Sequence, residues 1–243
     1  AIDGFEALVR WHHPERGLVA PADFINLAEE TGLIVKLGAW ILDEVCRQAA
    51  VWQSQAPDGD AFLVTTNLSA RQLSNPALVD QVAMALRNSG VNPSRIALEI
   101  TEDVLMDDTA ATMRTLSDLE GLGVGLGIDD FGTGYSSLGY LKRLPVGLVK
   151  IDQSFVAGLG HDSDDSAIVT AVVSLADALD MKVVAEGIQT SEQLAELLSL
   201  GCDYGQGFFF APPQPAPDLE ALVGNGRRWR PPGASLIQSV DQL

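Results

Sequence analysis

Short apolar runs that are typical of buried strands alternate with longer amphipathic segments along most of this chain. The expected strands are residues 4–11, 62–67, 95–100, 124–129, 148–151, 182–185 and 208–210. The expected helices are residues 21–31, 33–54, 76–89, 110–122, 166–179, 191–200 and 218–223. Repeated strand–helix units favour a parallel sheet that carries helices on its faces.

The first loop and the number of units decide between an open sheet and a barrel. A dinucleotide-binding sheet would carry a glycine fingerprint after its first strand, whereas the chain continues here with His13-Pro14-Glu15-Arg16-Gly17. About six strand–helix units in roughly 220 residues fit a (β/α)8 barrel, which typically has about 250 residues. We therefore predict an α/β fold of the TIM-like (β/α)8 barrel class.

Charge and composition narrow the possible partners. Lys and Arg total 15 against 33 Asp and Glu, a formal net charge of −18. This balance argues against binding of extended nucleic acid, which needs a basic surface, but it is compatible with a small anion held through metal ions. No apolar run approaches the roughly 18 residues of a membrane span. Two cysteines, Cys46 and Cys202, make no disulfide framework, so we expect a cytoplasmic domain.

Polar residues stand at or near the end of nearly every expected strand. Because parallel strands in a barrel end at one mouth, where barrel enzymes place their active sites, we expect these side chains to converge. They are Glu6, Asn67, Glu99, Asp129, Lys150, Glu186 and Gln206. Solvated strand ends or helix caps would explain any one of these residues, but not the whole set at one end of the sheet.

Crowding of negative charge at this mouth predicts metal ions. Glu6, Glu99, Asp129, Asp130 and Glu186 would bring five carboxylates together, and like charges this close oppose one another's ionisation. Carboxylate and amide oxygens suit Mg²⁺ or Mn²⁺. The adjacent Asp129 and Asp130 could serve two ions, which is the usual clamp for phosphoester hydrolysis.

Seven motifs in order resemble those of the EAL-domain cyclic di-GMP phosphodiesterases. The first, Glu6-Ala7-Leu8, is the signature that names the family. The others are Asn67-Leu68-Ser69, Glu99-Ile100-Thr101-Glu102, the run from Asp129-Asp130-Phe131-Gly132 to Leu138, Lys150-Ile151-Asp152, Ala185-Glu186-Gly187 and Gln206-Gly207-Phe208. The resemblance covers about residues 1–223. It implies a barrel enzyme that hydrolyses cyclic di-GMP to linear pGpG with two Mg²⁺ or Mn²⁺ ions.

The resemblance also implies roles for individual residues. Lys150, Glu186 and Gln206 match catalytic positions, where the lysine positions the attacking water and Glu186 lies beside that water. Leu8, Arg10 and Asp152 match substrate-binding positions, with Arg10 on a substrate phosphate. Glu102 resembles the glutamate that anchors the loop 130–137. The implied metal ligands are Glu6, Asn67, Glu99, Asp129 and Asp130.

Four further expectations concern organisation and function. Family members have another strand upstream of the first motif, so we expect this fragment to lack the first barrel strand. We expect an EAL domain over residues 1–223 and a tail rich in Arg, Pro and Gly over residues 224–243. We expect the full-length protein to carry an upstream regulatory domain. Membrane anchoring of the full-length protein and formation of a homodimer are both compatible with the sequence. The alternative function is a catalytically silent module that only binds cyclic di-GMP.

Overall fold

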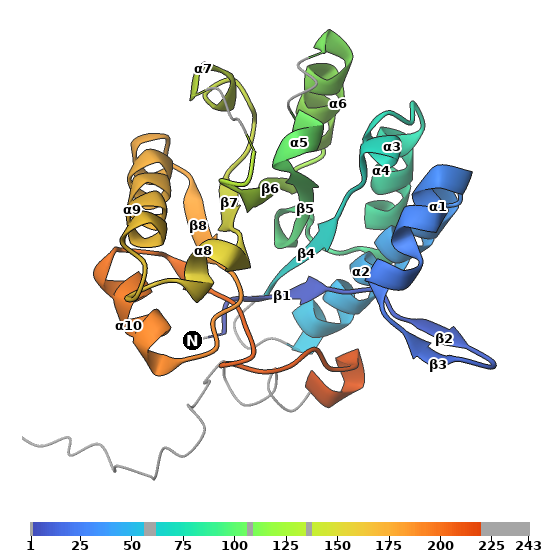
Figure 1. The fold of residues 1–243 in the computed structure, drawn as a ribbon. Coiled ribbons are helices and arrows are strands. Elements are labelled where there is room, and N and C mark those ends of the chain that lie inside the picture. The colour runs from blue at the N-terminus through green and yellow to red at the C-terminus, as the bar shows by residue number, and fades with distance from the viewer. Residues whose placement is uncertain (1, 56–61, 106–108, 135–137, 220–243) are drawn as a thin grey trace, which may run out of the picture.

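Seven parallel strands form one curled sheet in the computed structural model, which describes residues 2–55, 62–105, 109–134 and 138–219 (Figure 1). The strands follow one another across the sheet in chain order. They are β1 (Gly4–Ala7), β4 (Leu63–Asn67), β5 (Ile96–Thr101), β6 (Gly125–Phe131), β7 (Leu148–Ile151), β8 (Lys182–Ala185) and β9 (Tyr204–Gly205). Their carboxyl ends therefore lie on the same side of the sheet.

The sheet curls far enough for its two edges to approach each other. β1 and β9 are the edge strands, and no backbone ladder joins them among the described residues. Gln206, directly after β9, nevertheless donates a hydrogen bond from Nε2 to Oε2 of Glu6 in β1. This arrangement confirms the predicted barrel class, with seven of the eight strands of a (β/α)8 barrel.

Helices cover the outer face of the sheet (Figure 1). Several begin with a side-chain cap that the sequence supplies, such as Ser69 with Gln72 and Thr190 with Gln193. The α-helices are α1 (Ile25–Thr31), α2 (Ile34–Gln55), α3 (Ala70–Leu73), α4 (Leu78–Ser89), α5 (Glu102–Leu105), α6 (Ala110–Gly121), α7 (Leu138–Leu141), α8 (Gln153–Ala157), α9 (Ser163–Ala178) and α10 (Ser191–Ser199). The short 3-10 helices are labelled η1 (Pro21–Asp23) and η3 (Pro93–Arg95).

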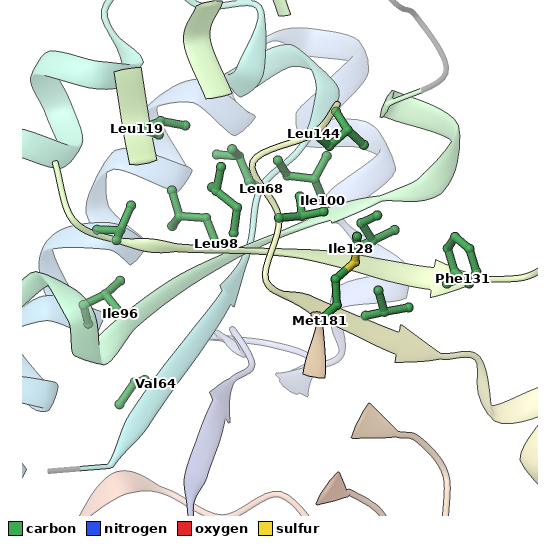
Figure 2. Packing of buried hydrophobic residues seen from close by; sticks show 14 of the residues in the cluster. Val64, Leu68, Ile96, Leu98, Ile100, Leu119, Ile128, Phe131, Leu144 and Met181 are labelled. Atoms are coloured by element: carbon green, nitrogen blue, oxygen red, sulfur yellow. The ribbon is translucent and has the colours of Figure 1, made fainter. Parts of the chain in front are cut away.

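Strand alternation separates the hydrophobic core from the barrel interior. In β5, Ile96, Leu98 and Ile100 are fully buried and pack toward the helices, near Leu119 of α6 (Figure 2). Glu99, between them in the sequence, points to the opposite face of the sheet, where it contacts Lys150. The core therefore lies outside the barrel, and its interior is left for polar side chains.

The first expected strand, residues 4–11, is divided between two separate strands. β1 ends at Ala7, and Trp11–His13 forms β2, which pairs antiparallel with β3 (Gly17–Val19) in a separate hairpin. The turn of this hairpin uses Gly17 at a φ of 72°, a conformation that favours glycine. The β2–β3 hairpin projects beyond the carboxyl end of β1 (Figure 1).

The prediction of a last strand at residues 208–210 is wrong. The last strand is β9, and the chain then turns back on itself, with the amide of Phe210 donating to the carbonyl of Gly207. Gly207 has a φ of 154°, and a Cβ there would lie 2.2 Å from the carbonyl oxygen of Ile188. The apolar run is therefore neither extended nor fully buried, because Phe208 is 68% exposed.

Two other expectations reach beyond what the structure describes. Residues 216–219 are helical, but the rest of the expected helix at 218–223 and the whole tail at 224–243 lie outside the described residues. Among the helices that are described, none is both long enough and apolar enough to cross a membrane.

Candidate active site

The ammonium of Lys150 lies at the centre of a cluster of carboxylates. Lys150 sits on β7 and is 1% exposed. Its Nζ is 2.6 Å from Oε1 of Glu186, 2.9 Å from Oε2 of Glu99, 3.1 Å from Oδ1 of Asp129 and 3.4 Å from Oε2 of Glu6. Four carboxylates thus meet at one cation, three from β1, β5 and β6 and the fourth from the residue directly after β8.

Strand register explains why these side chains meet. Asn67 pairs with Glu99, and Thr101 pairs with Asp129, across neighbouring parallel strands. Registered neighbours in a parallel sheet point to the same face. Glu99 also pairs with Gly127, where a Cβ would lie 3.6 Å from Cγ of Glu99. The small residue at position 127 therefore leaves room for the glutamate inside the barrel.

Two amides hold Glu6 in place. Asn67 donates from Nδ2 to Oε1 of Glu6 over 2.9 Å, and Gln206 donates to the other carboxylate oxygen. The backbone amide of Gln206 in turn donates to the carbonyl of Ala185, 2.8 Å away. The predicted set Glu6, Asn67, Glu99, Asp129, Lys150, Glu186 and Gln206 is therefore joined by direct contacts.

Burial shifts the proton affinity of these groups. Desolvation raises the pKa of Glu99 and of Glu186 to about 7 each, although the nearby Lys150 ammonium acts against the shift. For Lys150, burial opposes the charge, but the surrounding carboxylates outweigh it and raise its pKa above the usual range. The lysine is therefore cationic, and the two glutamates can gain or lose a proton near neutral pH.

Asp129, Asp130 and Glu186 form the group best suited to a cation. One carboxylate oxygen from each lies within 4.8 Å of the others. Oδ1 of Asp129 is buried and, although near Lys150, has no hydrogen-bond partner among the described residues. Burial, followed by the charge of Asp129, raises the pKa of Asp130. A divalent cation would bind this buried oxygen and offset the repulsion, so this donor set fits Mg²⁺ or Mn²⁺.

The loop after β6 is tied to the carboxylate of Glu102. Oε2 of this buried residue accepts from the amide of Gly132 at 2.9 Å and from the amide of Gly134 at 3.4 Å. Asp130 precedes the loop with a φ of 55°, which is uncommon for a residue other than glycine. The predicted position of Glu102 as a loop anchor agrees with these bonds, whereas residues 135–137 of the loop lie outside the described residues.

The three residues predicted to contact substrate lie in two different parts of the structure. Leu8 and Arg10 line the cavity that also contains Glu6, Asp129 and Lys150, and Leu8 is 41% exposed. Asp152 caps α8 by accepting from the amide of Ser154 at 3.0 Å, and its negative charge adds to the raised pKa of Asp130. One oxygen of the Asp152 carboxylate is thus already engaged in an intramolecular hydrogen bond.

Sequence reasoning missed part of the wall of this cavity. His12 and Leu18 from the β2–β3 hairpin line it on one side, and Tyr204 and Phe208 line it near β9. The hairpin residues carry no motif, and the hairpin itself was expected to be part of a longer strand. The pairing of β2 with β3 places His12 opposite Leu18, so both side chains lie on the face of the hairpin that lines the cavity.

His12 and His13 do not form a metal pair. The ring of His13 packs against Trp11 with centroids 4.8 Å apart, and its Nδ1 accepts from the amides of Glu15 and Arg16. Neighbouring strand residues face opposite sides, which agrees with the place of His12 on the cavity wall.

Comparisons with known proteins all indicate one family. A family model described as the EAL domain matches residues 1–213. The bifunctional diguanylate cyclase/cyclic di-GMP phosphodiesterase MucR of Pseudomonas aeruginosa is 50% identical over 221 residues, which is 90% of this chain and 32% of that protein. The cyclic di-GMP phosphodiesterase NbdA of the same organism is 41% identical over 241 residues, 99% of this chain and 30% of that protein.

A solved structure extends the likeness to three dimensions. PaMucR phosphodiesterase in its c-di-GMP complex superposes with a TM-score of 0.85 at 49% sequence identity, covering 89% of this chain and 87% of that one. The chain spans about a third of the length of the two curated relatives.

Proposed function

The chain belongs to the EAL domain family, and we propose on this basis that it hydrolyses cyclic di-GMP to linear pGpG with the help of Mg²⁺ or Mn²⁺. The observation that carries the proposal is the cluster around Lys150, in which four carboxylates at the ends of different strands surround one buried ammonium. Relatives named as cyclic di-GMP phosphodiesterases support the choice of substrate.

Two groups of ligands would hold the metal ions. Asp129, Asp130 and Glu186 already bring oxygens within 4.8 Å of one another. Glu6, Asn67 and Glu99 lie on the adjoining strands and extend the same acidic surface. When bound, divalent cations supply positive charge to the phosphodiester and acidify a water molecule.

The protein's own residues place and move the reacting groups. Lys150 remains charged among the carboxylates, so its ammonium can orient a water molecule and stabilise charge that develops on the phosphate. Glu186, whose Oε1 lies 2.6 Å from the Lys150 ammonium, can accept a proton from that water. The water oxygen then bonds to phosphorus, the bond from phosphorus to the 3′ oxygen breaks, and that oxygen takes up the proton that Glu186 accepted.

Substrate placement falls to the residues near β1. Arg10 lines the cavity beside the carboxylates and can pair with a phosphate of the dinucleotide. Its Nη1 donates to the carbonyl of Val9 at 2.8 Å, which fixes the guanidinium near the strand end. Leu8, partly exposed in the same cavity, offers apolar contact.

Product analysis separates an enzyme from a silent binding module. The chain should be incubated with cyclic di-GMP and Mg²⁺, and the products resolved by chromatography. Linear pGpG is the expected product, because one of the two phosphodiester bonds is broken. Binding of cyclic di-GMP without any product would contradict the proposal and favour the silent module. All the predicted metal ligands and Lys150 are present, which supports catalysis.

The wider setting of the domain remains a proposal. The curated relatives are about three times as long as the matched region, and MucR is named as bifunctional. These lengths support control of an EAL domain by additional domains. The boundary at residue 223, a homodimer and a cytoplasmic location stay predictions.

A further inference from the structure

We infer that the β2–β3 hairpin forms a binding surface for one purine base of the substrate, with His12 and Leu18 as its contact residues. The inference rests on the proposed function, which supplies a substrate with two guanine bases. It adds a positioning surface in a segment that carries none of the recognised motifs.

One face of the hairpin is fixed by packing. Trp11 contacts His13 with ring centroids 4.8 Å apart and Phe24 with centroids 5.8 Å apart. His13 also closes the turn by accepting two backbone hydrogen bonds. The hairpin is therefore anchored to the segment that leads into α1.

The opposite face has no such packing partner within the part of the chain that the structure describes. His12 and Leu18 are directly paired across the two strands, so their side chains lie next to each other. Leu18 is 61% exposed and His12 is also exposed. A leucine and an imidazole side by side present a flat, largely apolar surface of the kind on which a base can lie.

This face is continuous with the candidate active site. His12 and Leu18 line the same cavity as Glu6, Arg10 and Lys150. Leu8 and Arg10 lie on the chain between β1 and the hairpin. If Arg10 binds one phosphate of cyclic di-GMP, the guanine base of the adjoining nucleotide would reach the neighbouring hairpin. The faces of a purine ring are uncharged, so a base can lie close to the acidic residues of the cavity. A second phosphate would be repelled by them.

Kinetic analysis of three substitutions tests the inference. Leu18→Ala and His12→Ala remove the surface from either strand, and Leu27→Ala is the matched control. Leu27 is 61% exposed, like Leu18, but lies on α1 and is not among the residues that line the cavity. For each variant, KM and kcat for cyclic di-GMP are measured with saturating Mg²⁺, together with the Mg²⁺-induced shift in Tm without dinucleotide.

The expected result is a selective loss of substrate affinity. Leu18→Ala and His12→Ala should each raise KM about tenfold, the fold-change that corresponds to roughly 1.4 kcal/mol of lost contact with a base. Their kcat and their Mg²⁺-induced Tm shift should stay near those of the parent, and Leu18→Met should restore most of the affinity. Leu27→Ala should behave as the parent.

Two results would overturn the inference in distinguishable ways. A parent that forms pGpG while Leu18→Ala and His12→Ala keep the parent KM would show that the hairpin is not a base surface, and the proposed function would stand. A parent that neither binds nor hydrolyses cyclic di-GMP would overturn the proposed function and the inference with it.

Discussion

Lys150 has to balance more negative charge than one ammonium can offset. It touches Glu6, Glu99, Asp129 and Glu186, and it is almost fully buried. Buried charges are tolerated only when they are paired. The cluster therefore retains a surplus of carboxylate, which a divalent cation would neutralise. Catalysis and metal binding are thus expected to depend on the same electrostatic imbalance.

Lys150→Ala should separate chemistry from metal binding. The variant should still bind cyclic di-GMP with Mg²⁺ present, but turnover should fall by roughly 10² or more, the scale of losing one donor that stabilises developing charge. Without metal its Tm should fall, because four carboxylates lose their cation. Lys182→Ala is the matched control, since Lys182 is an exposed lysine paired with Asp203. Near-parent turnover in Lys150→Ala would show that Lys150 is structural.

Stability of the metal-free chain should decrease as pH rises from about 4.5 to about 7. The pKa values of Glu99 and Glu186 are raised from 4.5 to about 7, so the folded chain binds more protons than the unfolded chain in this window. The free energy of unfolding then falls with pH. Urea unfolding across the window, with chelator present, measures the slope.

Glu186→Gln should flatten this slope, because the amide has no proton to lose. The exposed Glu120→Gln serves as the control and should leave the slope unchanged. Saturating Mg²⁺ should also reduce the decline, since the cation takes the place of the protons. A slope that is the same in Glu186→Gln and in the parent would contradict the assignment of the raised pKa to Glu186.

At the scale of secondary-structure elements, the ends of the strands decide where the site lies. Polar side chains at the carboxyl ends of β4, β5, β6 and β7 could be found from the sequence, because parallel strands end on one side. The split of residues 4–11 and the turn at 208–210 could not. Both depend on tertiary packing, of Trp11 against Phe24 and of Gly207 against Ile188, which apolar periodicity does not encode.

The loop after β6 should depend on Glu102 for its shape. Glu102→Ala removes the acceptor for the amides of Gly132 and Gly134. Because Asp130 precedes this loop, we expect the Mg²⁺ concentration for half-maximal activity to rise about tenfold, as is typical when a residue behind a metal ligand is lost. Magnesium titration of pGpG formation measures the change. An unchanged midpoint would show that Asp130 is held by other contacts.

The barrel interior should not accommodate a large side chain at position 127 of β6. A Cβ at Gly127 would lie 3.4 Å from Cβ of Leu148 and 3.6 Å from Cγ of Glu99. Gly127→Leu should therefore displace Glu99 and lower the free energy of unfolding by about 1–3 kcal/mol, the usual cost of overpacking. Gly121→Ala is the control, because a Cβ at this end of α6 meets nothing within 4 Å. Equal Tm values for both variants would contradict this packing.

At the scale of the whole molecule, the curled sheet brings residues 200 positions apart into contact, as Glu6 and Gln206 show. The barrel class and the convergence of polar residues follow from the order of strands and helices. The identity of each contact does not, because side-chain hydrogen bonds depend on register and on the β-bulge between Ile128 and Phe131. The sequence therefore predicts which residues meet, but not that Lys150 lies at their centre.

Metal dependence of cyclic di-GMP hydrolysis tests the central claim most directly. Formation of pGpG should be followed by chromatography while Mg²⁺ or Mn²⁺ is titrated into chain freed of metal by a chelator. Activity should be absent without metal and should rise to a plateau with either ion. Asp129→Asn should lose both this activity and the metal-induced rise in Tm. Full pGpG formation after exhaustive chelation would contradict a metal-dependent phosphodiesterase centre at Asp129, Asp130 and Glu186.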